Sequence, residues 1–297
     1  MRKQLKELHD DLQKIKLTLF LNQNRDTLDT RILKCAAELS HASETGAMKY
    51  WRDLQIYLAT FDQAKHIASK VIQKVDLEPK ENVLPLINFV QNMHVPQAYS
   101  SLVKKMKDSN HFYETSETAL LAENIKNICG TEQTVFKTLP PALRHITANI
   151  VTLRNQWNNG YLYYQSEPHN FFTWFSPHKH RNHYDGLPAS RKPRGHWEFN
   201  LVDDKVQIIN ALNGDILMDS KTLFLVELVN DEEIQLKVHT SRNSKIIGKY
   251  LVGKARNRGE QFTQIAFFNK NETTVDQLKW SAQAVEPRPM PDLVQKC

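Results

Sequence analysis

The chain has 297 residues, 40% hydrophobic and 24% charged, which is the composition of a folded protein with apolar side chains for a sizeable core, and its length favours two domains. Its formal charge of +6 permits attraction to acidic partners, but lysines and arginines are spread along the chain among nearly as many acids. Charge alone therefore does not indicate nucleic-acid binding, and no helix-turn-helix, zinc-finger or RNA-reading motif is present.

The first predicted element is an amphipathic helix. Its apolar residues recur at alternating three- and four-residue steps, at Leu5, Leu8, Leu12, Ile15 and Leu19. This stripe lasts little more than two heptads, so we expect the helix to dock into a bundle rather than form a long coiled coil. The charged segment before Leu17 is unlike a signal peptide, and we expect any export signal to have been removed already. No run of eighteen apolar residues predicts a membrane-spanning helix.

Further helices are predicted up to residue 157. Helical spacing of apolar residues indicates helices over residues 32–39, 51–75, 84–93, 98–106, 116–129 and 141–157. Gly130 follows the fifth of these where a C-terminal glycine belongs, and Pro140-Pro141 can open the last. The apolar stripes could line a ligand cavity, but a helical bundle needs them as core in any case.

The pattern changes at Asn158-Asn159-Gly160, after which Tyr161 to Tyr164 begin a β-prone region. We therefore predict an α+β protein. Its expected parts are an N-terminal helical bundle domain over residues 1–158, an all-β antiparallel domain over 159–286 and an extended proline-rich tail over 287–297.

The β region is expected to be a set of hairpins. Over residues 195–218, two alternating segments meet at Asp203-Asp204 and a second turn follows at Asn213-Gly214. Residues 223–238 repeat strand, acidic turn and strand. The segments GYL at 160–162, WEF at 197–199 and VQIINALNG at 206–214 resemble one lobe of ricin-type β-trefoils. A β-trefoil is therefore our preferred fold, and a β-sandwich is the alternative.

A histidine-rich segment, SPHKHRNH at residues 176–183, is the first candidate for chemistry. Neutral imidazoles bind zinc or copper, and His178, His180 and His183 could converge in a loop. No Cys or Glu completes a recognised zinc motif, and Lys179 and Arg181 add repulsive charge, so a solvated loop is the alternative.

A basic stretch is the second candidate. Seven cations occur without an acid among them: Lys237, Arg242, Lys245, Lys249, Lys254, Arg256 and Arg258. Four more could join them from the preceding segment: Arg181, Arg191, Lys192 and Arg194. Brought together, these side chains would form an electropositive face suited to the sulfate or phosphate groups of heparin-like chains. On strands the same charges could instead be dispersed into solvent.

Two further features concern the compartment. Asn271-Glu272-Thr273 is an N-glycosylation acceptor in a predicted turn. The three cysteines, Cys35, Cys129 and Cys297, permit either one disulfide with an odd thiol or three reduced thiols. Their spacing matches no metal motif.

Two resemblances point outside the cell. The size, the charge and segments such as MKYWRDL at residues 48–54 resemble mosquito salivary secreted proteins. The order of helices and trefoil is similar to that of lepidopteran 30-kilodalton haemolymph lipoproteins, and LKWSA at residues 278–282 resembles their closing strand. Both resemblances imply an extracellular protein without enzymatic activity.

The sequence shows no Gly-x-Ser-x-Gly elbow, P-loop or nucleotide-binding glycine fingerprint. We therefore predict a secreted binding protein, without enzymatic activity or cofactor, that engages an extracellular or host protein or an anionic glycan through its basic β domain. The alternatives are a metal-dependent enzyme using the histidine loop and an intracellular adaptor whose N-terminal helices pair with a partner helix.

Overall fold

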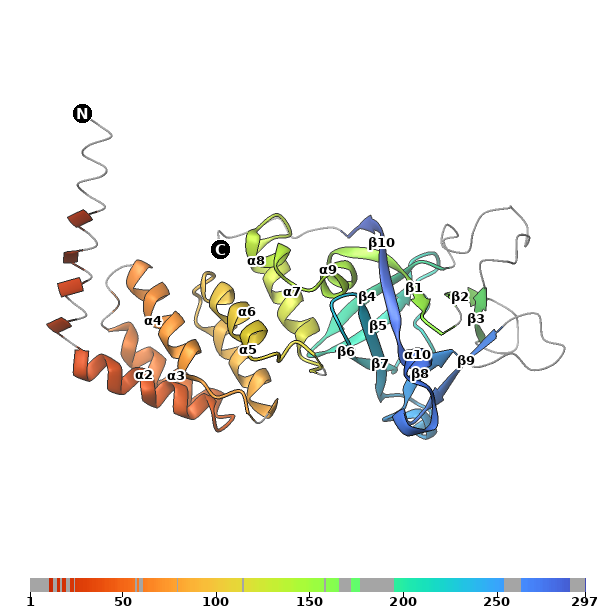
Figure 1. Ribbon diagram of the computed structural model, residues 1–297, viewed down its shortest axis with the longest axis horizontal. Helices are drawn as coiled ribbons and strands as arrows, with labels where there is room; N and C mark the ends of the chain where they lie inside the picture. The colour runs from red at the N-terminus through yellow and green to blue at the C-terminus, as the bar shows by residue number, and fades with distance from the viewer. Residues whose placement is uncertain are drawn as a thin grey trace, which may run out of the picture. The chain divides into compact units, whose positions relative to one another are not determined.

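The computed structural model describes residues 11–12, 15–16, 18–19, 22–23, 25–56, 58, 61–78, 80–113, 115–157, 159–165, 172–176, 195–253, 263–288 and 297 (Figure 1). The chain forms two compact units. The first contains Met1–Ser109 together with Cys297, and the second contains Asn110–Lys296. Each unit has buried apolar side chains of its own.

The first unit is helical. Its elements are α2 (Arg25–Leu39), α3 (Glu44–Gln55), α4 (Phe61–Lys74), η1 (Lys80–Asn82), α5 (Val83–Asn92) and α6 (Ala98–Asp108), which run from orange-red to yellow in Figure 1. Trp51 of α3 meets Phe89 of α5 edge to face, with ring centroids 6.1 Å apart, and both side chains are buried. Such a pair contributes packing between α3 and α5.

Two predictions for this unit are wrong. The single helix expected over residues 51–75 is divided, because α3 ends at Gln55 and α4 begins at Phe61. Ile56, just after the end of α3, is 80% exposed. The apolar residues before it belong to α3, and those from Phe61 onward belong to α4. In the described part of the N-terminal stripe, the predicted docking is wrong too. Leu12, Ile15 and Leu19 are helical but 49%, 56% and 54% exposed.

The second unit begins with helices. They are α7 (Thr118–Cys129), α8 (Thr134–Lys137) and α9 (Pro141–Ala148). α7 is capped by Gly130, which follows it with a φ of 86° that is costly for other residues, as expected for a C-terminal glycine. α9 packs against strands of the same unit, with His145 Nδ1 2.8 Å from the carbonyl oxygen of Ala282. The boundary that we expected near residue 158 therefore differs from the division of the compact units, which follows Ser109.

The helix predicted over residues 141–157 is wrong in its second half. It ends at Ala148, and the strand β1 (Asn149–Asn155) follows without a break. β1 pairs along its length with β10 (Trp280–Pro287) in antiparallel register. Ile150, Val151 and Thr152 are β-branched and fit this pairing, and a partner more than a hundred residues away decides the conformation.

The remaining strands are coloured from green to blue in Figure 1. They are β2 (Tyr161–Gln165), β3 (Phe172–Ser176), β4 (Trp197–Val202), β5 (Lys205–Asn210), β6 (Leu223–Leu228), β7 (Glu233–Thr240), β8 (Tyr250–Gly253) and β9 (Thr263–Phe268). The two hairpins predicted from alternation are confirmed as β4–β5 and β6–β7. In β5 and β6, buried and partly exposed residues alternate strictly.

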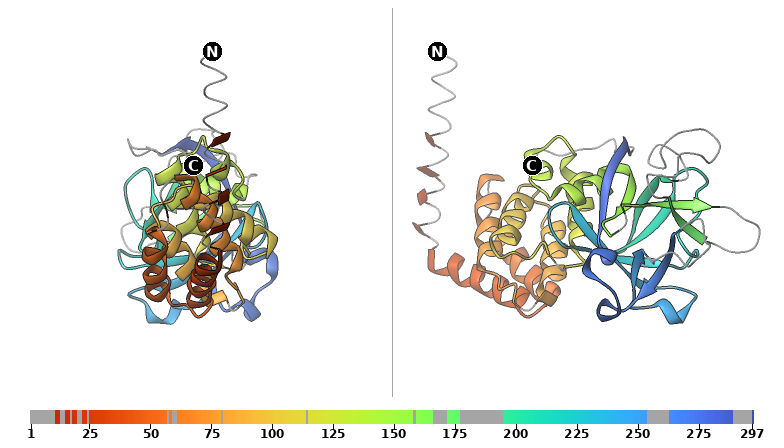
Figure 2. Two further views of the ribbon diagram at one scale, coloured as in Figure 1. Left: turned by 90° about the vertical axis from the view of Figure 1, so that its left-hand side faces the viewer. Right: turned by 45° about the vertical axis from the view of Figure 1, so that its right-hand side comes forward.

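Six of the strands close into a barrel. Their antiparallel pairings run β1–β4–β5–β6–β7–β10 and return from β10 to β1. The hairpin β2–β3 is inserted between β1 and β4, and β8–β9 is inserted between β7 and β10. Residues 211–222, which connect β5 to β6, are all described. Their pairing is a single bridge from Ile216 back to Ile209 of β5. Six barrel strands with an inserted segment in each of three repeats are the β-trefoil architecture, here with a hairpin inserted in the first and third repeats and a bridged turn in the second. The preferred fold is confirmed, and Figure 2 shows the ribbon of these strands from two further sides.

Two tryptophans mark the repeat. Trp197 is the first residue of β4, and its Nε1 donates to the carbonyl oxygen of Leu162, 3.0 Å away in β2. Trp280 is the first residue of β10, and its Nε1 donates to the carbonyl oxygen of Leu251, 3.0 Å away in β8. Each indole thus ties an inserted hairpin to the barrel by the same contact, in the first and the third repeat.

Candidate functional site

The loop between β7 and β8 carries two residues of the basic stretch, Arg242 and Lys245. The loop is pinned at both ends of its short helix η4 (Ser244–Ile246). Asn243 Oδ1 accepts a hydrogen bond from the backbone of Lys245 at 3.1 Å, and Ile246 is buried. Beyond it, the backbone nitrogen of Gly248 donates to Val238 at 2.8 Å with a φ of 79°. The loop therefore has a defined shape.

A single carboxylate, Asp219, holds this loop to the neighbouring turn. Its Oδ2 accepts hydrogen bonds from the hydroxyls of Thr222 at 2.8 Å and Ser241 at 2.9 Å, while its Oδ1 accepts from the backbone of Lys221 at 2.8 Å. Burial opposes ionisation of Asp219, but these bonds and one from the backbone of Arg242 outweigh it, so the pKa of Asp219 lies below its ordinary value. The Asp219 carboxylate is therefore ionised and occupied by hydrogen bonds from within the protein.

Three exposed cations lie on the two segments that Asp219 joins, and we call Lys221, Arg242 and Lys245 the loop cations. Arg242 Nη2 donates to the hydroxyl of Ser220 at 3.1 Å. Ser220 directly precedes Lys221 in the chain, so the guanidinium lies at the turn that carries Lys221. Thr240 also donates its hydroxyl to the carbonyl oxygen of Lys221 at 2.9 Å. Sequence reasoning missed Lys221, because it lies beside Asp219 and outside the acid-free stretch.

The other two described members of the stretch contact or lie near groups of other elements. Lys237 lies over the ring of Tyr250, with 5.6 Å from Nζ to the centroid, and the Tyr250 hydroxyl donates to Glu227 at 3.1 Å. Lys249 lies near Glu272, whose pKa is lowered first by hydrogen bonds within its own turn and to a lesser degree by Lys249. The stretch is acid-free in sequence, but the fold supplies carboxylates from β6 and from the turn after β9.

Several predicted site residues lie outside the described residues. These are Lys254, Arg256, Arg258, Arg181, Arg191, Lys192, Arg194, His178, His180 and His183. Among the residues that are described, no group of three or more His, Cys, Asp or Glu side chains is placed to hold a metal ion. From the predicted set, Arg242 and Lys245 share the described β7–β8 loop, and Arg242 reaches Ser220 of the turn that carries Lys221.

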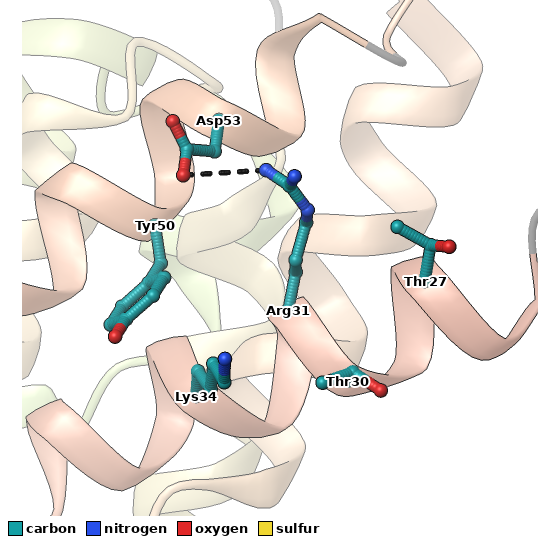
Figure 3. A pocket seen from close by; sticks show the side chains of 6 residues that line it. All are labelled: Thr27, Thr30, Arg31, Lys34, Tyr50 and Asp53. Carbon is teal, nitrogen blue, oxygen red and sulfur yellow. Dashed lines mark ion pairs between the residues drawn. The ribbon is translucent and has the colours of Figure 1, made fainter.

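Two surface hollows differ in charge. The groove between α2 and α3, of about 460 Å³, is lined by Thr27, Thr30, Arg31, Lys34, Tyr50 and Asp53 (Figure 3). Its cations face groups of the groove itself. Arg31 Nη1 lies 3.3 Å from Asp53 Oδ2, and Lys34 Nζ lies 5.9 Å from the Tyr50 ring. The groove is therefore less suited to an external anion than the loop cations are.

The second hollow, of about 490 Å³, belongs to the trefoil unit and is lined by Tyr113, Gln156, Asn230, Asp231, Glu232 and Glu233. The Tyr113 hydroxyl donates to Asp231 Oδ1 at 2.8 Å, and this bond is the main reason why the pKa of Tyr113 is raised. Carboxylates in this cleft repel an anionic ligand. An acidic and a basic region thus occur in the same unit.

The cysteines are in two states. Cys129 and Cys297 are disulfide-bonded, which, with three cysteines in the chain, leaves Cys35 as a free thiol. Cys35 is fully buried and its Sγ donates to the carbonyl oxygen of Ala47 at 3.3 Å. Burial, helped by Glu38, raises the pKa of this thiol to about 12. Cys35 is thus a core residue rather than a nucleophile.

The glycosylation acceptor is accessible. Asn271 is exposed in the short helix η5 (Lys270–Glu272), whose capping box joins Asn269 and Glu272. Thr273, the third residue of the acceptor, donates its hydroxyl to Gln277 at 2.7 Å. Within the described part of the chain, no helix has the length and apolar character needed to cross a membrane.

Comparison with known proteins finds similarity only among solved structures. No family model matches the chain, and no curated protein matches it. One similar structure is the Macrolepiota procera ricin B-like lectin in complex with lactose, at 9% identity and a TM-score of 0.34, covering 46% of this chain and 94% of that one. Another is ThreeFoil, a designed three-fold symmetric protein, at 11% identity and a TM-score of 0.33, covering 46% and 98%. The β-trefoil assignment rests on the strand pairings themselves.

Proposed function

We propose that this chain is an extracellular binding protein, without enzymatic activity, that holds an anionic glycan against the loop cations of its trefoil. The ligand class follows from the chemistry of the surface, because sulfate and carboxylate groups are the natural partners of exposed guanidinium and ammonium groups.

One observation carries the proposal. Arg242 and Lys245 are exposed on a loop whose shape is set by Ile246 and Asn243, and Lys221 joins them from the next turn. Among the described residues, none of these three side chains forms an ion pair. A loop that is already ordered loses little conformational entropy when a ligand binds, so these cations are preorganised for an anion.

The extracellular setting is supported by two further features. The disulfide-bonded state of Cys129 and Cys297 is typical of oxidising compartments. The exposed position of Asn271 is what an attached glycan requires. Neither feature depends on the loop cations, so the location and the ligand can be tested apart.

The test is heparin affinity chromatography of the full chain, in which the triple variant K221E/R242E/K245E is compared with wild type. We expect wild type to elute at a salt concentration that reflects ionic binding, and the variant to bind about ten-fold more weakly, since exposed ion pairs contribute about 0.2–1 kcal/mol each.

The matched control is K49E/K74E/K104E, which changes the net charge by the same amount at exposed lysines of the helical unit. We expect this control to stay close to wild type. Equal losses in both variants would mean that heparin senses only net charge, and retention that does not depend on salt would remove the anionic glycan.

A further inference from the structure

Two Asn-Gly pairs occur in the sequence, Asn159-Gly160 and Asn213-Gly214, and the structure describes both. An asparagine before glycine readily loses its side-chain amide, because glycine has no side chain to keep its backbone nitrogen away from the asparagine. Both asparagines are exposed, and both lie in connections between strands of the trefoil unit. Since the two pairs are chemically identical, their surroundings decide which of them reacts first.

The reaction needs no partner other than water. The backbone nitrogen of the glycine loses its proton and attacks Cγ of the asparagine. The bond from Cγ to Nδ2 then breaks, so that ammonia leaves and a cyclic imide remains. Water opens this ring at either carbonyl, which gives aspartate or isoaspartate. Negative charge develops on the glycine nitrogen and on Oδ1 during the attack, so a positive neighbour accelerates the step and a negative neighbour slows it.

Asn159 has a positive neighbour. Arg154 Nη2 donates to Asn159 Oδ1 at 2.8 Å. Within the described part of the chain, the Arg154 guanidinium forms no ion pair, so no carboxylate there neutralises its charge. The oxygen that becomes negative during the attack is thus already bound by a cation, and charge-assisted hydrogen bonds of this kind are the stronger ones.

Asn213 has a negative neighbour. Its Nδ2 donates to Asp215 Oδ2 at 2.8 Å, and its Oδ1 accepts from the backbone nitrogen of Asp215 at 3.0 Å. The backbone nitrogen of Gly214, which is the attacking atom, donates to the carbonyl oxygen of Asn210 at 2.9 Å. Both ends of the Asn213 amide are therefore held beside a carboxylate that opposes further negative charge.

The products differ in the same sense. An aspartate at position 159 would keep its contact with Arg154 as an ion pair, and aspartate tolerates the φ of 57° found there. An aspartate at position 213 would replace the Nδ2 donor by an oxygen and place it against the carboxylate of Asp215. The fold therefore accommodates the acid at the first position and repels it at the second.

We propose that Asn159 is a site of spontaneous deamidation in this protein and that the fold protects Asn213 from the same reaction. Each conversion adds one negative charge, which lowers the formal net charge from +6 to +5. The protein thus accumulates a more acidic form as it ages, modified in the connection between β1 and β2.

The experiment is incubation of the full chain at mildly alkaline pH, followed by proteolytic digestion and mass spectrometry of the peptides that contain each asparagine. We expect Asn159 to convert about ten-fold faster than Asn213 in the folded protein. The same chain in guanidinium chloride is the reference. Unfolding separates both pairs from their neighbours, so the two rates should become similar there.

Two variants test the charged neighbours separately. R154Q removes the positive charge and should slow the conversion of Asn159 roughly three-fold without changing that of Asn213. D215N removes the negative charge and should accelerate the conversion of Asn213 roughly three-fold without changing that of Asn159. Circular dichroism checks that both variants fold. Because Arg154 is partly buried in β1, D215N supplies the answer where R154Q fails to fold.

Equal rates at the two asparagines in the folded protein, or faster conversion of Asn213, would overturn the proposal. So would an Asn159 that stays intact in the folded chain while the denatured chain converts, since the ordered connection would then block the attack. Rates in folded R154Q and D215N that match those of wild type would also contradict it, because the neighbouring charges would then have no effect.

Discussion

At the residue scale, Asp219 organises the surface that we propose as the binding site. Its two oxygens accept from hydroxyls and backbone groups of both the β5–β6 turn and the β7–β8 loop. Charge-assisted hydrogen bonds of this kind are stronger than neutral ones. Asp219 thus holds together the two segments that carry Lys221 and Arg242, and its oxygens bind hydroxyl and backbone donors rather than the charged side chains of these two residues.

We expect the variant D219N to lower the free energy of unfolding near neutral pH by about 1–3 kcal/mol, because the amide offers one acceptor oxygen where the carboxylate offers two. The pKa of Asp219 in the folded protein lies below its ordinary value, so its stabilising contribution is present above the pKa of the unfolded chain and is lost as the pH falls through the folded pKa. The difference between variant and wild type should shrink in acid, as urea unfolding at several pH values would measure.

The control for this prediction is D203N. Asp203 is exposed in the β4–β5 turn with a φ of 57°, a conformation that asparagine tolerates as well as aspartate. A D219N variant as stable as D203N at neutral pH would contradict the role of Asp219.

At the element scale, the trefoil depends on how the inserted hairpins are fixed to the barrel. Trp197 and Trp280 are fully buried, and each donates one hydrogen bond to the second residue of a hairpin. The contacts are equivalent although the two hairpins differ in sequence. Barrel and hairpin thus form one packed element in each of the two repeats.

We predict that W197F and W280F each reduce the free energy of unfolding by about 1–3 kcal/mol, because each leaves a buried carbonyl oxygen without its donor. Chemical denaturation measures both. W157F is the control, since Trp157 is 40% exposed and surface substitutions usually change stability by less than about 0.5 kcal/mol. Unequal losses in the two variants would show that the repeats are not equivalent in energy.

At the scale of the whole molecule, the disulfide-bonded cysteines add a covalent link between distant parts of the chain. Cys129 ends α7, and Cys297 is the last residue of this sequence, so the bond closes a very long loop. Cross-links that close long loops reduce the entropy of the unfolded chain most in the chain-entropy model.

We expect C129S/C297S to lose about 2–5 kcal/mol of stability, measured as a lower midpoint of thermal or urea unfolding. Thiol titration supplies the control. Unfolded wild type should show one reactive thiol before reduction and three after it, while native wild type should show none, because Cys35 is buried. Three reactive thiols without reduction would exclude the disulfide.

Local patterns determined much of the β unit. Alternation around Asp203-Asp204 and around Asn230-Asp231 predicted the hairpins β4–β5 and β6–β7, because both strands of a hairpin and the turn between them are contiguous in sequence. Gly130 likewise ends α7 as expected, since a positive φ is a local requirement. The preference for a trefoil came from one recognisable lobe.

Tertiary structure decided what depends on distant partners. Residues 150–153 have spacing that suits a helix, yet they form β1 because β10 pairs with them. The basic stretch has no acid along the chain, yet Glu272 lies near Lys249, and Glu227 accepts a hydrogen bond from the tyrosine whose ring Lys237 covers. The sequence alone determined the order of helical and extended segments, since periodicity is local. Only the fold decided which apolar stripe stays exposed and which cations face solvent, since both depend on contacts between segments far apart in the chain.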